Sequence, residues 1–119
     1  MGNRSKRGTI YVAGPMRGYE NYNFDTFDRA ATMLECEGWN VISPADLDRM
    51  YEGWSAYPPK GITFTREDYR RFILRDIHAI IENCDAVAFL PGWESSAGCK
   101  VEHAVAEFFS LDIIYLEAL

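Results

Sequence analysis

The pattern of apolar and polar residues alternates between two kinds of segment along the chain. Four short stretches are continuously apolar or β-branched and end at a turn or polar residue, as strands buried in a parallel sheet do. They cover residues 9–14, 39–43, 86–91 and 112–116. Between them, apolar residues recur every three or four positions over 24–38, 66–83 and 96–109, which predicts three helices.

Strands that alternate with helices indicate an α/β fold, because a helix that crosses between two strands makes those strands parallel. We therefore expect a three-layer sandwich of flavodoxin- or Rossmann-like type, with a mostly parallel sheet of four to five strands. Asn23 is placed to cap the first helix and Gly38 to end it.

The chain is long enough for one domain, which we assign to residues 9–119 after a flexible basic arm, residues 1–8. Residues 45–65 resist a regular assignment, because aromatic residues are mixed there with proline and glycine. A structureless stretch of this length is often a lid or a binding loop, and a loop packed on the surface is the alternative.

The charge balance narrows the classes of partner. The chain carries 12 basic and 18 acidic residues, a net charge of −6, and three of the bases lie within the first seven residues. A general nucleic-acid binder presents a basic face, so this role is disfavoured. A small anion is still compatible, because one arginine and a helix N-terminus hold a phosphate locally.

The three cysteines, Cys36, Cys84 and Cys99, are widely spaced and form no CxxC pair, which favours reduced and mostly buried thiols. They make no metal-ligand pattern with the two histidines, so we expect no metal. No signal peptide and no apolar run long enough to span a membrane is seen. We expect a cytoplasmic protein without a membrane partner.

Three polar stretches follow predicted strands: "GPMRG" (14–18), "SPAD" (43–46) and "PGWESSAG" (91–98). In open parallel sheets, ligands bind outside the carboxyl ends of the strands, so these stretches are expected to share one site. Ser96 is placed to cap the helix that follows, leaving backbone N–H groups to attract an anion. Gly98 allows close approach to that backbone, and Arg17 adds a charge-assisted contact to a phosphate.

Glu102 lies six residues beyond Ser96, in an otherwise apolar part of the helix. At the helical rise this separation is about 9 Å along the axis, close to the reach from a 5′-phosphate to the anomeric carbon of a nucleotide. A carboxylate placed there can attack that carbon or stabilise its developing positive charge. The alternative for Glu102 is an ordinary helical acid paired with a nearby base.

The segments "IYVAGPMRG", "RDIHAIIENCDAVAFLPGWESSAG" and "KVEHAVAEF" resemble the nucleoside 2-deoxyribosyltransferase-like superfamily. The similarity runs from about residue 9 to residue 115 and is weakest over 45–65. Within the superfamily the chain looks like a small branch of bacteriophages and bacteria related to nucleoside 5′-monophosphate N-glycosidases.

The resemblance implies that Glu102 is a nucleophile that forms a covalent glycosyl-enzyme intermediate. It implies that Tyr11 positions this glutamate and that Asp76 acts near the sugar or base and helps to protonate the leaving group. At the position of Ser96, relatives that exchange bases carry aspartate, whereas nucleotide hydrolases carry serine. The residues expected to bind substrate are Gly14, Pro15, Met16, Arg17, Gly18, Ser95, Ser96 and Gly98.

These assignments favour hydrolysis of a nucleoside 5′-monophosphate, without a metal or organic cofactor. Base exchange by a deoxyribosyltransferase and a catalytically silent nucleotide-binding module are the alternatives, and cleavage of NAD is a more distant one. By analogy with the superfamily, we expect a homodimer or a higher homo-oligomer.

Overall fold

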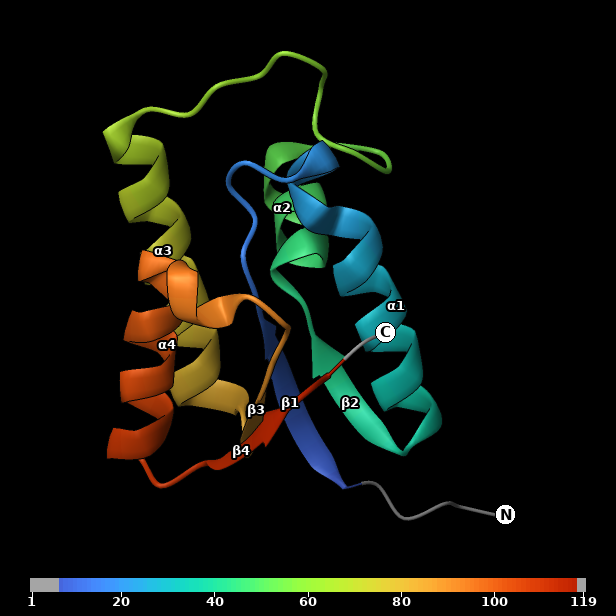
Figure 1. The fold of residues 1–119 in the computed structure, drawn as a ribbon, viewed down its shortest axis with the longest axis vertical. Coiled ribbons are helices and arrows are strands. Elements are labelled where there is room, and N and C mark those ends of the chain that lie inside the picture. Colours follow the sequence, from blue (N-terminus) through green and yellow to red (C-terminus); the bar gives the residue numbers. More distant parts are fainter. Residues whose placement is uncertain (1–6, 118–119) are drawn as a thin grey trace.

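The computed structural model describes residues 7–117, and these form a sheet with helices on both faces (Figure 1). The predicted basic arm therefore lies mostly outside the described residues. In chain order the elements are β1 (Gly8–Ala13), η1 (Glu20–Asn23), α1 (Phe24–Cys36), β2 (Trp39–Ile42), α2 (Pro44–Glu52), α3 (Arg66–Asn83), β3 (Ala86–Phe89), η2 (Trp93–Ser95), α4 (Ala97–Phe108) and β4 (Asp112–Tyr115).

The sheet has four strands in the order β2-β1-β3-β4, and all three pairings are parallel. The predicted α/β class is confirmed, with four strands where four to five were expected. The chain moves outward from β1 to β2, then crosses back to β3 on the other side of β1. The strand order therefore reverses between β1 and β3, and this is where open α/β sheets bind ligands.

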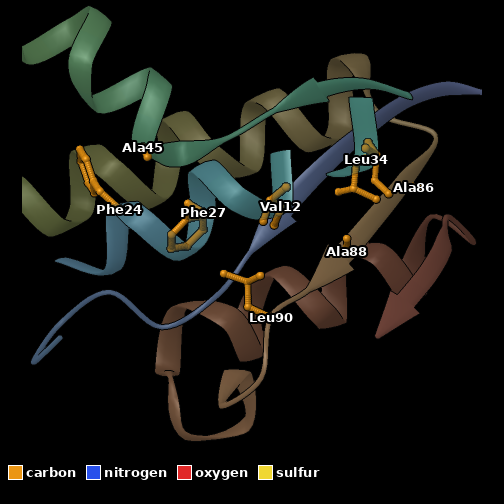
Figure 2. Packing of buried hydrophobic residues seen from close by; sticks show 10 residues of the cluster. Val12, Phe24, Phe27, Leu34, Ala45, Ala86, Ala88 and Leu90 are labelled. Carbon is orange, nitrogen blue, oxygen red and sulfur yellow. The ribbon is translucent and has the colours of Figure 1, made fainter. Parts of the chain in front are cut away.

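Alternate residues of the two central strands face opposite layers of helices. Ile10 and Val12 of β1 pack in a cluster with the apolar side of α1, which includes Phe24, Phe27 and Leu34 (Figure 2). Tyr11 and Ala13 face the other layer, where α3 and α4 lie side by side. Helices α1 and α2 thus cover one face of the sheet and α3 and α4 the other, which confirms the three-layer sandwich.

Helix α2 corrects the interpretation of residues 45–65 as irregular. The Ser43 side chain accepts the N–H of Ala45, Pro44 occupies the first turn, and Gly53 ends the helix at φ 75°. Proline tolerates the first helical turn, and glycine adopts the left-handed conformation that closes many helices. The sequence thus contained a start signal and a stop signal only nine residues apart, and the mixed aromatic composition obscured them.

The segment 53–65 has no helix or strand, and it arches from α2 to the beginning of α3 (Figure 1). Aromatic contacts tie it to the body: Trp54 packs on Phe24, and Phe64 packs on Tyr22 and Phe72. The carbonyl of Ile62 also accepts the Tyr22 hydroxyl at 3.1 Å. A lid function for this segment stays a prediction.

Both residues predicted to cap a helix occupy the N-cap position, but only Ser96 caps with its side chain, and the cap of α3 at Thr65 was not predicted. Thr65 and Asp68 form a reciprocal capping box at α3, and Ser96 caps α4 as predicted. Asn23 is the N-cap residue of α1, as predicted, but its side chain makes no capping hydrogen bond. Its backbone is left-handed, at φ 66°, and its amide donates to the carbonyl of Pro15 at 2.8 Å.

All three cysteines are free thiols, and two of them, Cys84 and Cys99, are buried, whereas Cys36 is exposed. Burial raises the pKa of each buried thiol to about 12, so both stay protonated. Among residues 7–117, no helix is both long and apolar enough to cross a membrane.

Candidate functional site

A cavity of about 650 Å³ opens at the carboxyl ends of β1 and β3, where the strand order reverses. Its size is within the range of small-ligand sites. Of the predicted site residues, all but Gly18 line it: Tyr11, Gly14, Pro15, Met16, Arg17, Asp76, Ser95, Ser96, Gly98 and Glu102. The structure thus brings together residues that are 91 positions apart in the chain.

Glu102 and Tyr11 form the floor of this cavity. The Tyr11 hydroxyl donates to Oε2 of Glu102 at 2.7 Å, and the side chains come from α4 and from the centre of β1. Tyr11 is fully buried and Glu102 is 6% exposed. Glu102 is therefore not an ordinary solvated helical acid.

Burial dominates the electrostatics of Glu102. Loss of hydration raises the pKa of its carboxyl to about 8, and the negative charge of Asp76 adds to the increase. The hydrogen bond from Tyr11 and the charge of Arg75 act in the opposite direction. The pKa of Tyr11 is also raised, by burial first and then by the charges of Asp76 and Glu102.

Asp76 comes from α3 and is 8% exposed. Its Oδ1 accepts Nε of Arg75 at 3.0 Å and Nη2 of Arg75 at 2.8 Å. Burial raises the pKa of Asp76, and the Arg75 guanidinium partly offsets that increase. The two predicted catalytic acids thus lie in one cavity with unequal surroundings, because only Asp76 has a cation bonded to it.

Asp48 is a third acid of the cavity, and the sequence did not identify it. It lies on α2 and pairs with Nη2 of Arg75 at 2.8 Å, so Arg75 bridges the carboxylates of Asp48 and Asp76. Burial raises the pKa of Asp48 to about 6, and Arg75 opposes the increase. The sequence feature that could have identified Asp48 is the helix start at Ser43-Pro44. A helix that begins there places Asp48 one turn beyond Pro44, where it lines the cavity.

The N-terminus of α4 forms one side of the cavity. Ser96 is in extended conformation, and its Oγ accepts the N–H of Cys99 at 3.3 Å. This cap uses an acceptor of the serine and leaves its O–H free to donate. The N–H groups of Ala97 and Gly98, in the first turn, have no carbonyl within their own helix to bond to, and they line the cavity.

The loop after β1 lies opposite this terminus. A Cβ on Gly14 would lie 2.4 Å from Leu90, so packing requires glycine there. Arg17 is exposed, and its guanidinium lies over the ring of Tyr69 on α3, 3.8 Å from the ring centroid. Gly18 does not line the cavity, and its φ of 87° is a left-handed conformation that glycine adopts readily in a turn.

Residues 21–23 form a left-handed turn beside the cavity, with φ values of 50°, 52° and 66°. Such a conformation costs roughly 1–2 kcal/mol for each residue that has a Cβ. The turn places Tyr22 in the cavity wall, under the segment 53–65 that accepts its hydroxyl. Strained backbone is concentrated at functional sites, so this turn adds support for a site here.

Trp54 and Trp93 do not line the cavity, because both pack against other aromatic rings. Trp93 stacks on His103 with ring centroids 4.5 Å apart, and Trp54 packs on Phe24 and Phe64. Besides Tyr11, the aromatic residues that line it are Tyr19, Tyr22, Tyr69 and Phe72. Asp85 lies outside the cavity, just before β3, and accepts the N–H of Thr9 at 2.9 Å.

Over residues 7–117, no group of three or more histidine, cysteine, aspartate or glutamate side chains is arranged to hold a metal ion. The cavity is lined by three carboxyl groups and the Tyr11 hydroxyl, together with arginines and the residues of the α4 N-terminus. Such a cavity suits a ligand with an anionic group at one end and a centre of developing positive charge at the other.

Comparison with known proteins identifies a family but no characterised relative. No curated protein matches the chain. One family model, described as "Domain of unknown function (DUF4406)", matches residues 8–115, which include every strand and helix given above. The protein therefore belongs to the DUF4406 family.

Proposed function

We propose that the protein hydrolyses the N-glycosidic bond of a nucleoside 5′-monophosphate and releases the free base and the sugar 5-phosphate. One observation carries the proposal: the Glu102 carboxyl, bonded to Tyr11, forms the floor of the same cavity that contains the α4 N-terminus and Arg17. The sequence resemblance to the nucleoside 2-deoxyribosyltransferase-like superfamily supports the same role for Glu102.

The phosphate is held at the α4 N-terminus. The N–H groups of Ala97 and Gly98, the Ser96 hydroxyl and the helix dipole favour an anion there, and Arg17 adds a positive charge. A Cβ on Gly98 would make only ordinary contacts, the nearest at 3.8 Å to Ile73. Packing therefore does not require this glycine, and close approach of the ligand explains it.

In the first step, an oxygen of ionised Glu102 attacks C1′ of the sugar as the bond from C1′ to the base nitrogen breaks. The base departs with the bonding electrons and takes a proton from neutral Asp76. The products of this step are the free base, a glycosyl ester on Glu102 and an Asp76 carboxylate, which Arg75 stabilises.

In the second step, water attacks C1′ and gives its proton to the Asp76 carboxylate. The ester bond breaks, and Glu102 leaves as a carboxylate with its hydrogen bond from Tyr11 restored. The sugar 5-phosphate is released, and Asp76 is neutral again for the next substrate.

The raised pKa values favour Glu102 as the protonated partner in the free protein, because burial raises the pKa of its carboxyl to about 8 whereas Arg75 favours the Asp76 carboxylate. The proposed reaction therefore requires this proton to lie on Asp76 once the substrate is bound. With the pKa of Glu102 at about 8 and that of Asp76 also raised, the two carboxyls together retain a proton at neutral pH. A singly protonated pair supplies one carboxylate and one acid, which is what glycosidic cleavage requires. Tyr11, whose hydroxyl bonds to Glu102, stabilises the form in which Glu102 is the carboxylate.

The proposal is tested by incubating the protein with a panel of nucleoside 5′-monophosphates and the matching nucleosides, with free base separated by chromatography. We expect release from at least one monophosphate, little from its nucleoside, and loss of release in Glu102→Gln. Glu94→Gln, an exposed acid just before α4, is the matched control and is expected to retain activity. Release that survives Glu102→Gln would contradict the assignment of the nucleophile.

Two further arms separate the alternatives. A second free base added to the reaction gives a new nucleotide only if the enzyme transfers the sugar. A 2-deoxy-2-fluoro nucleotide slows hydrolysis of the glycosyl ester, so intact mass spectrometry is expected to show one covalent sugar phosphate on wild-type protein and none on Glu102→Gln. A protein that binds a nucleotide but releases no base and forms no adduct would be a silent binding module.

A further inference from the structure

Three arginines line the cavity away from its acidic floor: Arg17, Arg66 and Arg70. None of them forms an ion pair with an acidic residue within 7–117. Three arginines outside this group are each paired with at least one acid: Arg49, Arg71 and Arg75. In a chain with a net charge of −6, three uncompensated cations in one cavity mark a place for an anionic ligand.

The three guanidinium groups belong to one region of the cavity wall. Arg66 and Arg70 are four residues apart at the start of α3, so they are neighbours on one helical face. Arg17 joins them because it stacks on Tyr69, which precedes Arg70 on the same helix. Like charges at this spacing repel one another, and a bound anion removes that repulsion.

The acids of the same helical turn do not neutralise this region. The Asp68 carboxylate accepts the N–H of Thr65 at 2.8 Å and Nη2 of Arg71 at 3.0 Å, and neither Glu67 nor Asp68 lines the cavity. The capping box at Thr65 also engages the N–H groups of Thr65 and Asp68. The arginine side chains, rather than the helix terminus, are therefore what this wall offers to a ligand.

One phosphate is accounted for by the α4 N-terminus and Arg17, which leaves Arg66 and Arg70 without a partner. We propose that the cavity binds a nucleoside 5′-diphosphate, with the inner phosphate at α4 and Arg17 and the outer phosphate at Arg66 and Arg70. This inference rests on the proposed function, because it uses the same site and the same position for C1′, and it extends the substrate class by one phosphate.

The test measures binding rather than turnover, by isothermal titration calorimetry on Glu102→Gln with matched mono- and diphosphates of each common nucleoside. We expect at least one diphosphate to bind about tenfold more tightly than its monophosphate, since an added charge-assisted contact is worth about 1.4 kcal/mol or more. In a variant that combines Glu102→Gln, Arg66→Gln and Arg70→Gln, this preference is lost and the monophosphate affinity changes by less than about twofold.

The charge-matched control combines Glu102→Gln, Arg7→Gln and Arg29→Gln, because Arg7 and Arg29 are exposed and outside the cavity. It is expected to retain the preference for the diphosphate. Equal weakening of mono- and diphosphate binding by the Arg66 and Arg70 substitutions would overturn the inference, since all three arginines would then hold one phosphate. Equal affinity of the starting protein for both ligands would overturn it as well. Failure of the proposed function is recognised separately, as absence of base release from every nucleotide.

Discussion

The buried carboxyl of Glu102 makes a prediction about stability that does not depend on any substrate. A folded protein whose acid has a raised pKa retains a proton that the unfolded chain gives up. The ordinary pKa of a glutamate is 4.5, and in the folded protein that of Glu102 is about 8. The stabilisation associated with its neutral form is therefore complete below about pH 4.5 and is lost as the pH rises through 8.

The size of the effect follows from the shift. Between pH 4.5 and 8, each pH unit removes up to about 1.4 kcal/mol of unfolding free energy, which gives at most about 5 kcal/mol in total. Glutamine has the shape of the neutral acid and does not ionise. We therefore expect Glu102→Gln to be similar to wild type near pH 4.5 and more stable by about 2–5 kcal/mol at pH 9.

Urea unfolding at half-unit steps from pH 4.5 to 9 measures this difference for wild type, Glu102→Gln and Glu94→Gln. The curves for wild type and Glu94→Gln are expected to stay parallel, because Glu94 is exposed. The pH dependence contributed by Asp48 is present in all three proteins and cancels in the comparison, whereas the coupling between Asp76 and Glu102 is part of the measured difference. A difference between Glu102→Gln and wild type that is constant across the range would show that Glu102 titrates as an exposed acid, and the site as described would be refuted.

Three further changes test other parts of the site. Tyr11→Phe removes a hydrogen bond that favours the Glu102 carboxylate, so by urea unfolding it is expected to cost about 1 kcal/mol more at pH 9 than at pH 5, and an equal cost at both pH values would contradict the bond. Arg75→Met leaves Asp48 and Asp76 buried without their cation, so we expect it to lower the free energy of unfolding by about 3–5 kcal/mol at pH 8 and by less at pH 5. The control is Arg71→Met, at an exposed ion pair, which should lower it by about 1 kcal/mol or less. Gly98→Ala is expected to raise the free energy of unfolding by up to about 1 kcal/mol through helix propensity, and with it the thermal midpoint, while it weakens nucleotide binding in calorimetry. Unchanged binding would show that no ligand approaches this backbone.

The sequence predicted the sheet and three long helices because each has a strong period of its own. The strand residues 86–89 are all buried, and residues 66–83 repeat apolar positions over five turns. The rule that ligands bind at the carboxyl ends of parallel strands then placed Arg17, Ser96 and Glu102 together without knowledge of their contacts. These predictions needed only the order of elements, and a sequence specifies that order well.

What the sequence did not predict depends on contacts between segments. Asp48 was missed because its helix has only nine residues and lies in a stretch rich in aromatic residues, proline and glycine. Arg75 was given no role because its bridge between Asp48 and Asp76 exists only when α2 and α3 lie together. The left-handed turn at 21–23 has no glycine to indicate it, and tertiary contacts such as the one from Asn23 to Pro15 hold it.

A purely structural explanation accounts for Asp48 and Asp76 but not for Glu102. Buried carboxylates are tolerated when a cation is bonded to them, and Arg75 is bonded to both aspartates. No cation is bonded to Glu102, whose side-chain partners are the neutral Tyr11 hydroxyl and Cys99 thiol, and burial raises the pKa of its carboxyl to about 8, above the value of about 6 for Asp48. An acid that is costly to ionise in the free protein is stabilised most by a positive charge that arrives next to it. In the reaction that we propose, the glycosidic carbon of a nucleotide develops such a charge as its bond to the base breaks, so the substrate supplies the cation that Glu102 lacks in the free protein.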